Sequence, residues 1–375
     1  MLKCIYCGNK DSKYFYFRNE RPYCKKCVGF IGEKVNNKTN VVNNYNYELN
    51  YKLTKEQNKL SINILKSFKS QKNVLVNAVC GAGKTELLFK TISYALSKSM
   101  KVGFTIPRKD VVIDLLPRFK NVFKNNSVIA VYGGNNNVLE GDIVLLTTHQ
   151  LYRYNNYFDL LIIDEIDAFP YYGNKVLNSM FLKAVKGNYV MLSATPTDEM
   201  IKSIKDNNGK YFTLFKRYHN APLPVPKMVL TIVDPFPFLI SYLYKFLSNG
   251  CPVLIFVPTI KEGEVLFEKL KMNRFQGEFV HSKKINRDKI IDDFKNKKYH
   301  YLITTSILER GITIRNLQVI IYNCDNLVFD KKTIIQIAGR VGRKKDATQG
   351  EVILISKTQS QDMIDAIKDI KDANR

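Results

Sequence analysis

The sequence has no long apolar run and no sign of an export signal. No stretch approaches the roughly 18 consecutive apolar residues that a membrane-spanning helix needs, so we expect no transmembrane segment. The N-terminal residues MLKCIYCGNK lack the apolar core of a signal peptide. These absences predict a cytoplasmic protein, in a compartment where cysteine thiols stay reduced.

Acidic residues are too few to balance the basic ones. The 375 residues include 58 Lys and Arg but only 34 Asp and Glu, which gives a formal net charge of +24. Such an excess favours a polyanionic partner, most simply nucleic acid. A basic surface that faces only solvent or acidic lipid is the alternative. The hydrophobic content of 45% is typical of a globular protein with real cores.

Short β-rich runs alternate with helical patterns along most of the chain. This alternation predicts an α/β fold with parallel sheets that are covered on both faces. An Asn-rich stretch over 35–50 reads as a linker, and the Pro-rich segment APLPVPK (221–227) interrupts the alternation. We therefore predict a small module over 1–34, a linker over 35–50 and two lobes over 51–220 and 221–375. Strands are expected at 73–79, 101–107, 127–132, 142–148, 159–164, 252–258, 277–282, 301–306, 317–323 and 350–356, and helices at 84–97 and 359–375.

Four of the seven cysteines lie in the first 27 residues. Their spacing, Cys4-x₂-Cys7-x₁₆-Cys24-x₂-Cys27, supplies two close pairs that suit a tetrahedral Zn²⁺ site of the ribbon or knuckle type. About thirty residues bury too little apolar surface to fold without such a metal. The predicted compartment disfavours disulfides, and the paired spacing disfavours an iron–sulfur cluster. Interleaved aromatic and basic residues in this segment suit either base stacking or the small core of the module.

A glycine-rich loop follows the first predicted strand of lobe 1. The sequence Ala78-Val-Cys-Gly-Ala-Gly-Lys84-Thr85 is a Walker A pattern in which Ala replaces the first Gly. Backbone amides of the loop would wrap phosphate oxygens, Lys84 would reach the β- and γ-phosphates of ATP, and Thr85 would hold Mg²⁺. The strand before and the helix after disfavour a chance Gly-rich turn. The predicted nucleotide contacts in this loop are Val79, Cys80, Gly81, Ala82, Gly83, Lys84, Thr85 and Glu86.

Adjacent carboxylates end the predicted strand at 159–164. A carboxylate at the carboxyl edge of a buried parallel strand faces the nucleotide crevice, whereas an acidic turn elsewhere on the surface would lack that strand. Asp164 is therefore predicted to bind Mg²⁺, and Glu165 to polarise the attacking water.

With these two motifs in place, the chain resembles the superfamily 2 helicases of the DEAD/DEAH-like group, which have two RecA-like lobes. Ser193-Ala194-Thr195 is similar to motif III, which couples hydrolysis to lobe movement, and 304–314 resembles motif V, with Gly311 as a nucleotide contact. Leu53-Thr54-x-x-Gln57 is similar to the adenine-reading Q motif. Residues 336–343 resemble motif VI, whose Arg340 and Arg343 would serve hydrolysis, although Gln336 and Ile337 replace the frequent His-Arg.

The combination of DEIDAFP, SATPT, ILERGITI, QIAGRVGRK and the four-cysteine module resembles the ComFA family of DNA-uptake ATPases. The resemblance implies movement of single-stranded transforming DNA through a ComEC-like channel, with a ComFC-like protein as partner, at the inner face of the cell membrane. It leaves a homo-oligomer open. An unwinding helicase of the replication-restart type and a nucleic-acid-binding adaptor with a weak nucleotide site are the alternatives.

Candidate DNA contacts follow from the same resemblance. In this architecture nucleic acid crosses both lobes, and hydroxyls, lysines and backbone amides grip phosphates without reading sequence. His149 and His281 are equally well explained as core histidines. The candidates are Arg108, Thr148 and His149 in lobe 1, and His281, Lys283 and Thr304 in lobe 2.

Overall fold

The computed structural model describes residues 2–5, 7–18, 21–30, 32–35, 47–49, 51–79, 81–167, 170–219, 221–273, 275–281, 283–305, 314–344 and 346–374. The chain divides into two compact units. The first contains Met1–Ala78 and Gly83–Leu214, and the second contains Val79–Ala82 and Phe215–Arg375. Cys80, Gly311, most of the predicted linker and most of the motif V match lie outside the described residues.

A parallel sheet organises the first unit. Its strand order is β5-β6-β4-β7-β8-β3-β9, and every neighbouring pair runs parallel. The central strands are continuous buried apolar runs, as expected for a sheet with both faces covered. The five strands predicted here are confirmed, and β8 and β9, for which no range was predicted, complete the sheet of seven strands. The strands are β3 (Val74–Ala78), β4 (Val102–Ile106), β5 (Val128–Val131), β6 (Ile143–Thr147), β7 (Phe158–Ile163), β8 (Val185–Ser193) and β9 (Lys210–Leu214).

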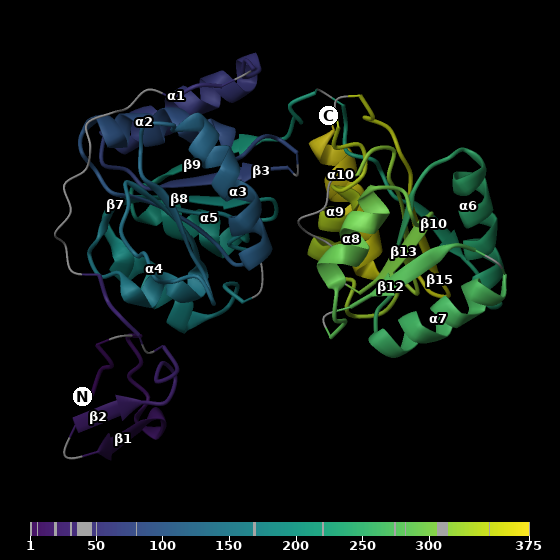
Figure 1. Ribbon diagram of the computed structural model, residues 1–375, viewed down its shortest axis with the longest axis horizontal. Coiled ribbons are helices and arrows are strands. Elements are labelled where there is room, and N and C mark those ends of the chain that lie inside the picture. Colours follow the sequence, from purple (N-terminus) through teal and green to yellow (C-terminus); the bar gives the residue numbers. More distant parts are fainter. Residues whose placement is uncertain are drawn as a thin grey trace. The chain divides into compact units, whose positions relative to one another are not determined.

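Helices cover both faces of this sheet. Figure 1 shows α1, α2 and α3 on one side of the strands and α4 on the other. The helix predicted over 84–97 begins with a 3₁₀ turn, η2, and continues as α2. The helical elements are α1 (Lys55–Lys69), η2 (Glu86–Leu88), α2 (Phe89–Ser97), α3 (Lys109–Val122), η3 (Thr148–Arg153), α4 (Lys175–Ala184) and α5 (Asp198–Asp206).

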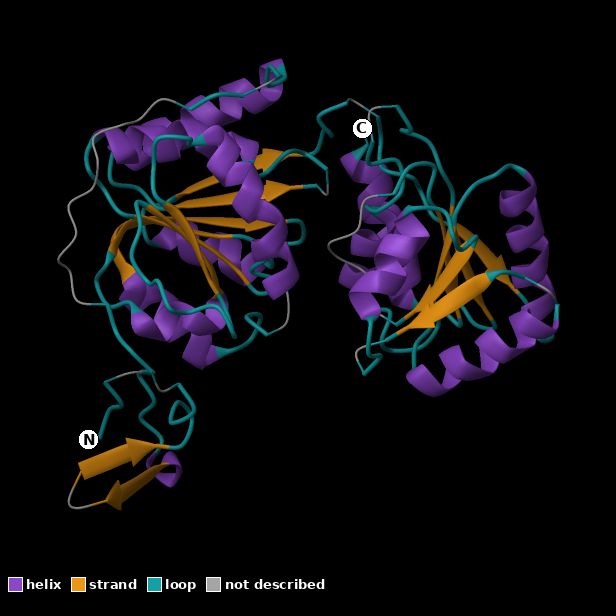
Figure 2. Cartoon of the chain, viewed as in Figure 1, coloured by secondary structure: helices purple, strands orange, loops and turns teal. Residues whose placement is uncertain are grey.

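The second unit is built on another parallel sheet, whose strands are drawn as orange arrows in Figure 2. Its strand order is β10-β15-β14-β11-β13-β12. All five strands predicted in this part of the chain are confirmed. The sheet has one more strand, β10, which begins at the last residue of the Pro-rich segment. It lies at the edge of the sheet, where neighbouring prolines, which have no backbone N–H to donate, are tolerated. The strands are β10 (Lys227–Leu230), β11 (Val253–Phe256), β12 (Gly277–Val280), β13 (Tyr301–Thr304), β14 (Gln318–Tyr322) and β15 (Val352–Ser356).

Helices also cover the second sheet. Leu239 and Leu243 of α6 and Leu266 of α7 pack with strand residues in one apolar cluster. The predicted C-terminal helix is confirmed as α10, which packs beside α9 and buries Met363 and Ile370. The two units are therefore the RecA-like α/β lobes that the sequence predicts. The helices are α6 (Phe236–Ser248), α7 (Ile260–Met272), α8 (Arg287–Lys295), α9 (Lys331–Ala338) and α10 (Gln361–Ala373).

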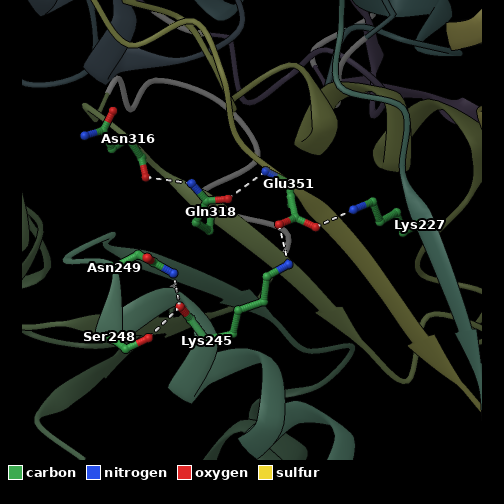
Figure 3. Close-up of polar contacts among 7 residues, drawn as sticks. All are labelled: Lys227, Lys245, Ser248, Asn249, Asn316, Gln318 and Glu351. Atoms are coloured by element: carbon green, nitrogen blue, oxygen red, sulfur yellow. Dashed lines mark hydrogen bonds and ion pairs between the residues drawn. The ribbon is translucent and has the colours of Figure 1, made fainter.

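A polar cluster ties the amino ends of three strands in the second unit (Figure 3). The Glu351 carboxylate accepts from the ammonium groups of Lys227 at 2.6 Å and Lys245 at 2.5 Å. Its backbone amide donates to Oε1 of Gln318 at 2.6 Å, and that side chain in turn donates to the Asn316 carbonyl. Glu351 thus joins β10, α6 and β14 through one residue that precedes β15.

The N-terminal module contains a 3₁₀ turn, η1 (Ser12–Tyr14), and an antiparallel hairpin of β1 (Phe15–Arg18) and β2 (Arg21–Cys24). An arm over 30–35 leads from the module to η3. In that arm, the Val35 amide donates to the Arg153 carbonyl at 3.0 Å, and Nη1 of Arg153 donates to the Glu33 carbonyl at 2.9 Å. The Arg153 side chain is almost fully buried, so these contacts fix the arm against η3.

Candidate functional site

The phosphate loop leaves the carboxyl end of β3 and leads to η2. Gly81 and Gly83 adopt left-handed backbone conformations, with φ of 83° and 74°, which glycine reaches at no steric cost. A β-carbon at Gly83 would lie 2.6 Å from Nε2 of Gln57. The loop therefore has a tight backbone without side chains at its bends, as phosphate oxygens require.

Two adjacent carboxylates follow β7. The Asp164 amide donates to the Thr105 carbonyl of β4 at 3.0 Å, so this residue still lies at the sheet edge. Glu165 has φ of 58°, a conformation that non-glycine residues seldom adopt and that recurs at functional sites. Burial raises the pKa of Asp164 to about 6, and the positive charge of Lys84 opposes that rise. The first lobe therefore brings Lys84 and Asp164 within electrostatic reach of each other.

Thr85 and Asp164 are the residues that would hold Mg²⁺. Their oxygen donors match the preference of Mg²⁺ for hard ligands. The carboxyl of Asp164 is desolvated, so a cation beside it would favour the ionised form. Held by these two residues, Mg²⁺ would supply positive charge that offsets the negative charge of the phosphates.

Motif III is joined to the carboxylate loop by a direct side-chain contact. The Thr195 hydroxyl donates to Oδ2 of Asp167 at 2.9 Å, and the Thr195 amide donates to Oγ of Ser193 at 3.0 Å. The fully buried Ser193 ends β8. No role was predicted for Asp167, although its place as the third carboxylate of DEID was a usable signal.

Glu86 and Gln57, both predicted nucleotide contacts, are engaged by the protein. The Glu86 carboxylate accepts from the Tyr51 hydroxyl at 2.8 Å and pairs with Arg118. Burial, followed by the neighbouring Glu86 charge, raises the pKa of Tyr51 to about 12. The side-chain oxygen of Gln57 accepts from the backbone amide of Thr54 at 2.9 Å, and the backbone amide of Gln57 donates to Oγ1 of Thr54. The two bonds form a capping box at the start of α1. Their roles toward ATP remain predictions.

The motif VI arginines lie in the second unit, in the loop that follows α9. Arg340 is only 2% exposed, and Nε of Arg343 donates to the Gly339 carbonyl at 2.9 Å. Gln336, at the start of the motif, is also buried. We call residues 339–343 the arginine loop.

The four N-terminal cysteines converge. Their sulfur atoms all lie within 4.8 Å of one another, and all four side chains are buried. The Sγ atoms of Cys4 and Cys27 are 3.5 Å apart and those of Cys7 and Cys24 are 3.6 Å apart, too far for a disulfide bond. These separations fit a tetrahedral site, because Zn–S bonds of about 2.3 Å place the sulfur atoms about 4 Å apart. Burial raises the pKa of the Cys7 thiol to about 11, so a bound cation would be needed to favour the thiolates.

The candidate DNA contacts differ in exposure. The Thr148 and Thr304 side chains are fully buried, and the Thr304 hydroxyl donates to the Thr305 carbonyl. His149 stacks on Phe30 of the module's arm, with 6.0 Å between ring centroids, and desolvation lowers its pKa. Arg108 is the N-cap residue of α3, His281 packs near Phe279 and Lys283 is exposed. In this conformation, neither threonine is accessible to a phosphate.

Comparison with known proteins agrees with this arrangement. A family described as "Type III restriction enzyme, res subunit" matches residues 50–198, and one described as "Helicase conserved C-terminal domain" matches 238–345. Competence protein ComFA of Bacillus subtilis (strain 168) is 33% identical over 99% of this chain and 85% of its own length. The chain belongs to the ComFA family. Competence protein ComFA of Streptococcus pneumoniae (strain ATCC BAA-255 / R6) is 34% identical over 86% of this chain and 77% of its own length.

Solved structures agree on the fold. Saccharomyces cerevisiae Dbp5 bound to RNA and ADP BeF3 has a TM-score of 0.62 and 19% identity, and the match covers 86% of this chain and 92% of that one. As a ComFA-family member with both helicase domains, the protein is a nucleic-acid-binding, helicase-like ATPase with a role in competence. ATP and Mg²⁺ are the substrate and metal expected of this helicase superfamily. None of the helices in the described part of the chain is long and apolar enough to cross a bilayer.

Proposed function

We propose that this protein is a single-stranded-DNA-dependent ATPase and translocase that drives transforming DNA across the membrane into the cytosol during natural competence. The observation that carries the proposal is the ComFA alignment, which covers 99% of the chain. The net charge of +24 supports a polyanionic substrate.

In this proposal the predicted site residues act together on ATP. Lys84 binds the β- and γ-phosphates, Thr85 and Asp164 hold Mg²⁺, and Glu165 orients the attacking water. Arg340 and Arg343 offset the charge of the transferred phosphoryl group when the lobes close, so that lobe geometry depends on the nucleotide. Ser193, Ala194 and Thr195 transmit that change, while Gln57, the other phosphate-loop residues and Gly311 complete the nucleotide site.

The division of labour follows the predicted domains: a zinc module over 1–34, a linker over 35–50, and lobes over 51–220 and 221–375. Single-stranded DNA would cross the two lobes at Arg108, His149, His281 and Lys283, and Thr148 and Thr304 would join these contacts only after a rearrangement that exposes them. Since such contacts are made to phosphate, affinity should fall steeply with salt.

The proposal also places the protein among partners. We infer that it works at the inner face of the membrane with a ComEC-like channel and a ComFC-like protein, and a homo-oligomer fits the same role. Zn²⁺ on Cys4, Cys7, Cys24 and Cys27 would hold the N-terminal module folded.

Phosphate release from ATP in the presence of single-stranded DNA, duplex DNA or RNA tests this proposal. We expect single-stranded DNA to stimulate hydrolysis most strongly and Lys84→Ala to abolish it, while Lys98→Ala, which removes an exposed lysine at the end of α2, leaves it unchanged. Equal rates with and without DNA, or a preference for RNA, would overturn the proposal. Processive unwinding of long duplexes would instead favour the replication-restart type of helicase.

A further inference from the structure

Phe215–His219, the segment that follows β9, contains a buried cation outside the helicase motifs. We call this segment the strap. Arg217 is only 2% exposed and is among the largest fully buried side chains of the described residues. A guanidinium is so costly to bury that it normally has several hydrogen-bond acceptors.

The acceptors of Arg217 are the carbonyls of the arginine loop. Its Nη1 donates to the Val341 carbonyl at 2.8 Å and to the Gly342 carbonyl at 3.0 Å, and Nη2 is 3.3 Å from the Gly339 carbonyl. These carbonyls follow the C-terminus of α9, where backbone acceptors lack helical partners and the helix dipole favours a cation. The forked guanidinium can serve all three acceptors at once, which a lysine ammonium cannot do in the same geometry.

The loop itself has little freedom to adopt another shape. Gly342 has φ of 65°, and a β-carbon there would lie 2.2 Å from the Thr348 carbonyl oxygen. Tyr218, the next strap residue, donates its hydroxyl to the Arg343 carbonyl at 3.0 Å. The strap therefore contacts the backbone of four of the five residues in the arginine loop.

The strap also contacts the phosphate loop. The Tyr218 amide donates to the Gly81 carbonyl at 3.2 Å, and a β-carbon on Gly81 would lie 3.7 Å from the Arg217 side chain. The strap thus contacts both Gly81, which belongs to the same compact unit, and the loop that contains Arg340 and Arg343.

We propose that Arg217 is a positioning residue for ATP hydrolysis, which holds the arginine loop in the shape that presents Arg340 and Arg343. The inference rests on the proposed function, because it gives the arginine loop a part in hydrolysis. Arg217 acts through the backbone carbonyls that it binds rather than by touching ATP. Its removal should therefore affect the transition state more than the bound ground state.

The test compares wild type, Arg217→Lys and Lys271→Gln as full-length proteins. Arg217→Lys retains the positive charge, and Lys271→Gln controls for the substitution of an exposed side chain, since Lys271 of α7 pairs only at the surface with Glu268 and lies in the same compact unit as Arg217. For Arg217→Lys we expect kcat with single-stranded DNA to fall at least about tenfold, since sub-ångström placement of catalytic groups matters this much, while KM for ATP stays within about twofold. Binding of ADP with aluminium fluoride should weaken, and binding of ADP alone should not.

An active wild type with unchanged kcat in Arg217→Lys would overturn the inference alone, as would an equal loss of ADP and ADP–aluminium fluoride binding. A wild type without DNA-stimulated hydrolysis would remove both the proposed function and this inference. Should Arg217→Lys fail to fold, Tyr218→Phe decides. It deletes only the hydroxyl bound to the Arg343 carbonyl, and we expect kcat to fall about threefold; an unchanged kcat would contradict the inference.

Discussion

Thr195 of motif III donates its hydroxyl to the carboxylate of Asp167, in the loop after β7. The two residues are 28 positions apart in the chain, but they meet because β7 and β8 pair in parallel and both loops leave the same sheet edge. The contact joins the loop of the carboxylates that are predicted to serve ATP hydrolysis to the motif that is expected to couple hydrolysis to movement.

Replacing Thr195 tests this link. We expect Thr195→Val to lower the free energy of unfolding by only about 0.5–1.5 kcal/mol, the net value of one hydrogen bond. The substitution should also reduce the rate of DNA-stimulated ATP hydrolysis by more than the small loss of stability can explain. Thr195→Ser retains the hydroxyl and is the matched control. Equal activity of the Val and Ser variants in steady-state assays would show that the link has no part in turnover.

The two loop glycines predict a graded result. Gly81→Ala introduces only backbone strain, because a β-carbon there has no contact shorter than 3.7 Å, whereas Gly83→Ala adds a 2.6 Å approach to Gln57. We expect Gly81→Ala to cost about 1–2 kcal/mol of stability from its left-handed backbone, and Gly83→Ala to cost more. Thermal unfolding and ADP affinity should both rank the variants in this order. The reverse order would contradict the loop geometry.

Glu351 predicts a pH-dependent stability. Burial raises its pKa, but the ammonium groups of Lys227 and Lys245 together lower it more, so the folded-state pKa lies below the ordinary value. A lowered carboxyl pKa stabilises the fold above the unfolded-state pKa, near 4.5, and this contribution disappears as pH falls through the folded-state pKa. We expect Glu351→Gln to cost about 1 kcal/mol at pH 7 and less near pH 3, where more of the carboxyl is protonated.

Denaturant unfolding at both pH values measures this difference. The control is Glu268→Gln, since Glu268 is an exposed partner of Lys271 and its loss should change stability little at either pH. If Glu351→Gln lowered the free energy of unfolding equally at both pH values, the ionised carboxylate could not be the source of the stabilisation.

The cysteine cluster predicts a metal content. We expect about one zinc ion per chain in the purified protein, released by Cys24→Ser but retained by Cys251→Ser, because Cys251 lies outside the cluster. Loss of zinc should also expose the module to proteases, since its small core cannot hold the fold alone. Elemental analysis and limited proteolysis check both points. A Cys24→Ser protein that keeps its zinc would contradict the site.

Much of the fold was predictable because the signals are local. Buried parallel strands are continuous apolar runs, and a phosphate loop needs glycine at fixed places between a strand and a helix. The ten predicted strands and the C-terminal helix were therefore found, as were the phosphate loop, the carboxylates after β7 and the four cysteines. No range was predicted for β8, and the short, partly exposed strands β9 and β10 have no such pattern.

Tertiary structure decided the features that depend on contacts between distant residues. Arg217 and the Val341 carbonyl are 124 positions apart, as are Lys227 and Glu351, and no periodicity or spacing in the chain relates them. Burial of Thr148 and Thr304 likewise depends on packing from neighbouring elements. The sequence thus specifies which chemical groups this ATPase has and which strand ends they follow. Only the folded chain determines which are buried, which face one another and which cation holds the arginine loop, because those outcomes depend on packing and desolvation across the whole lobe.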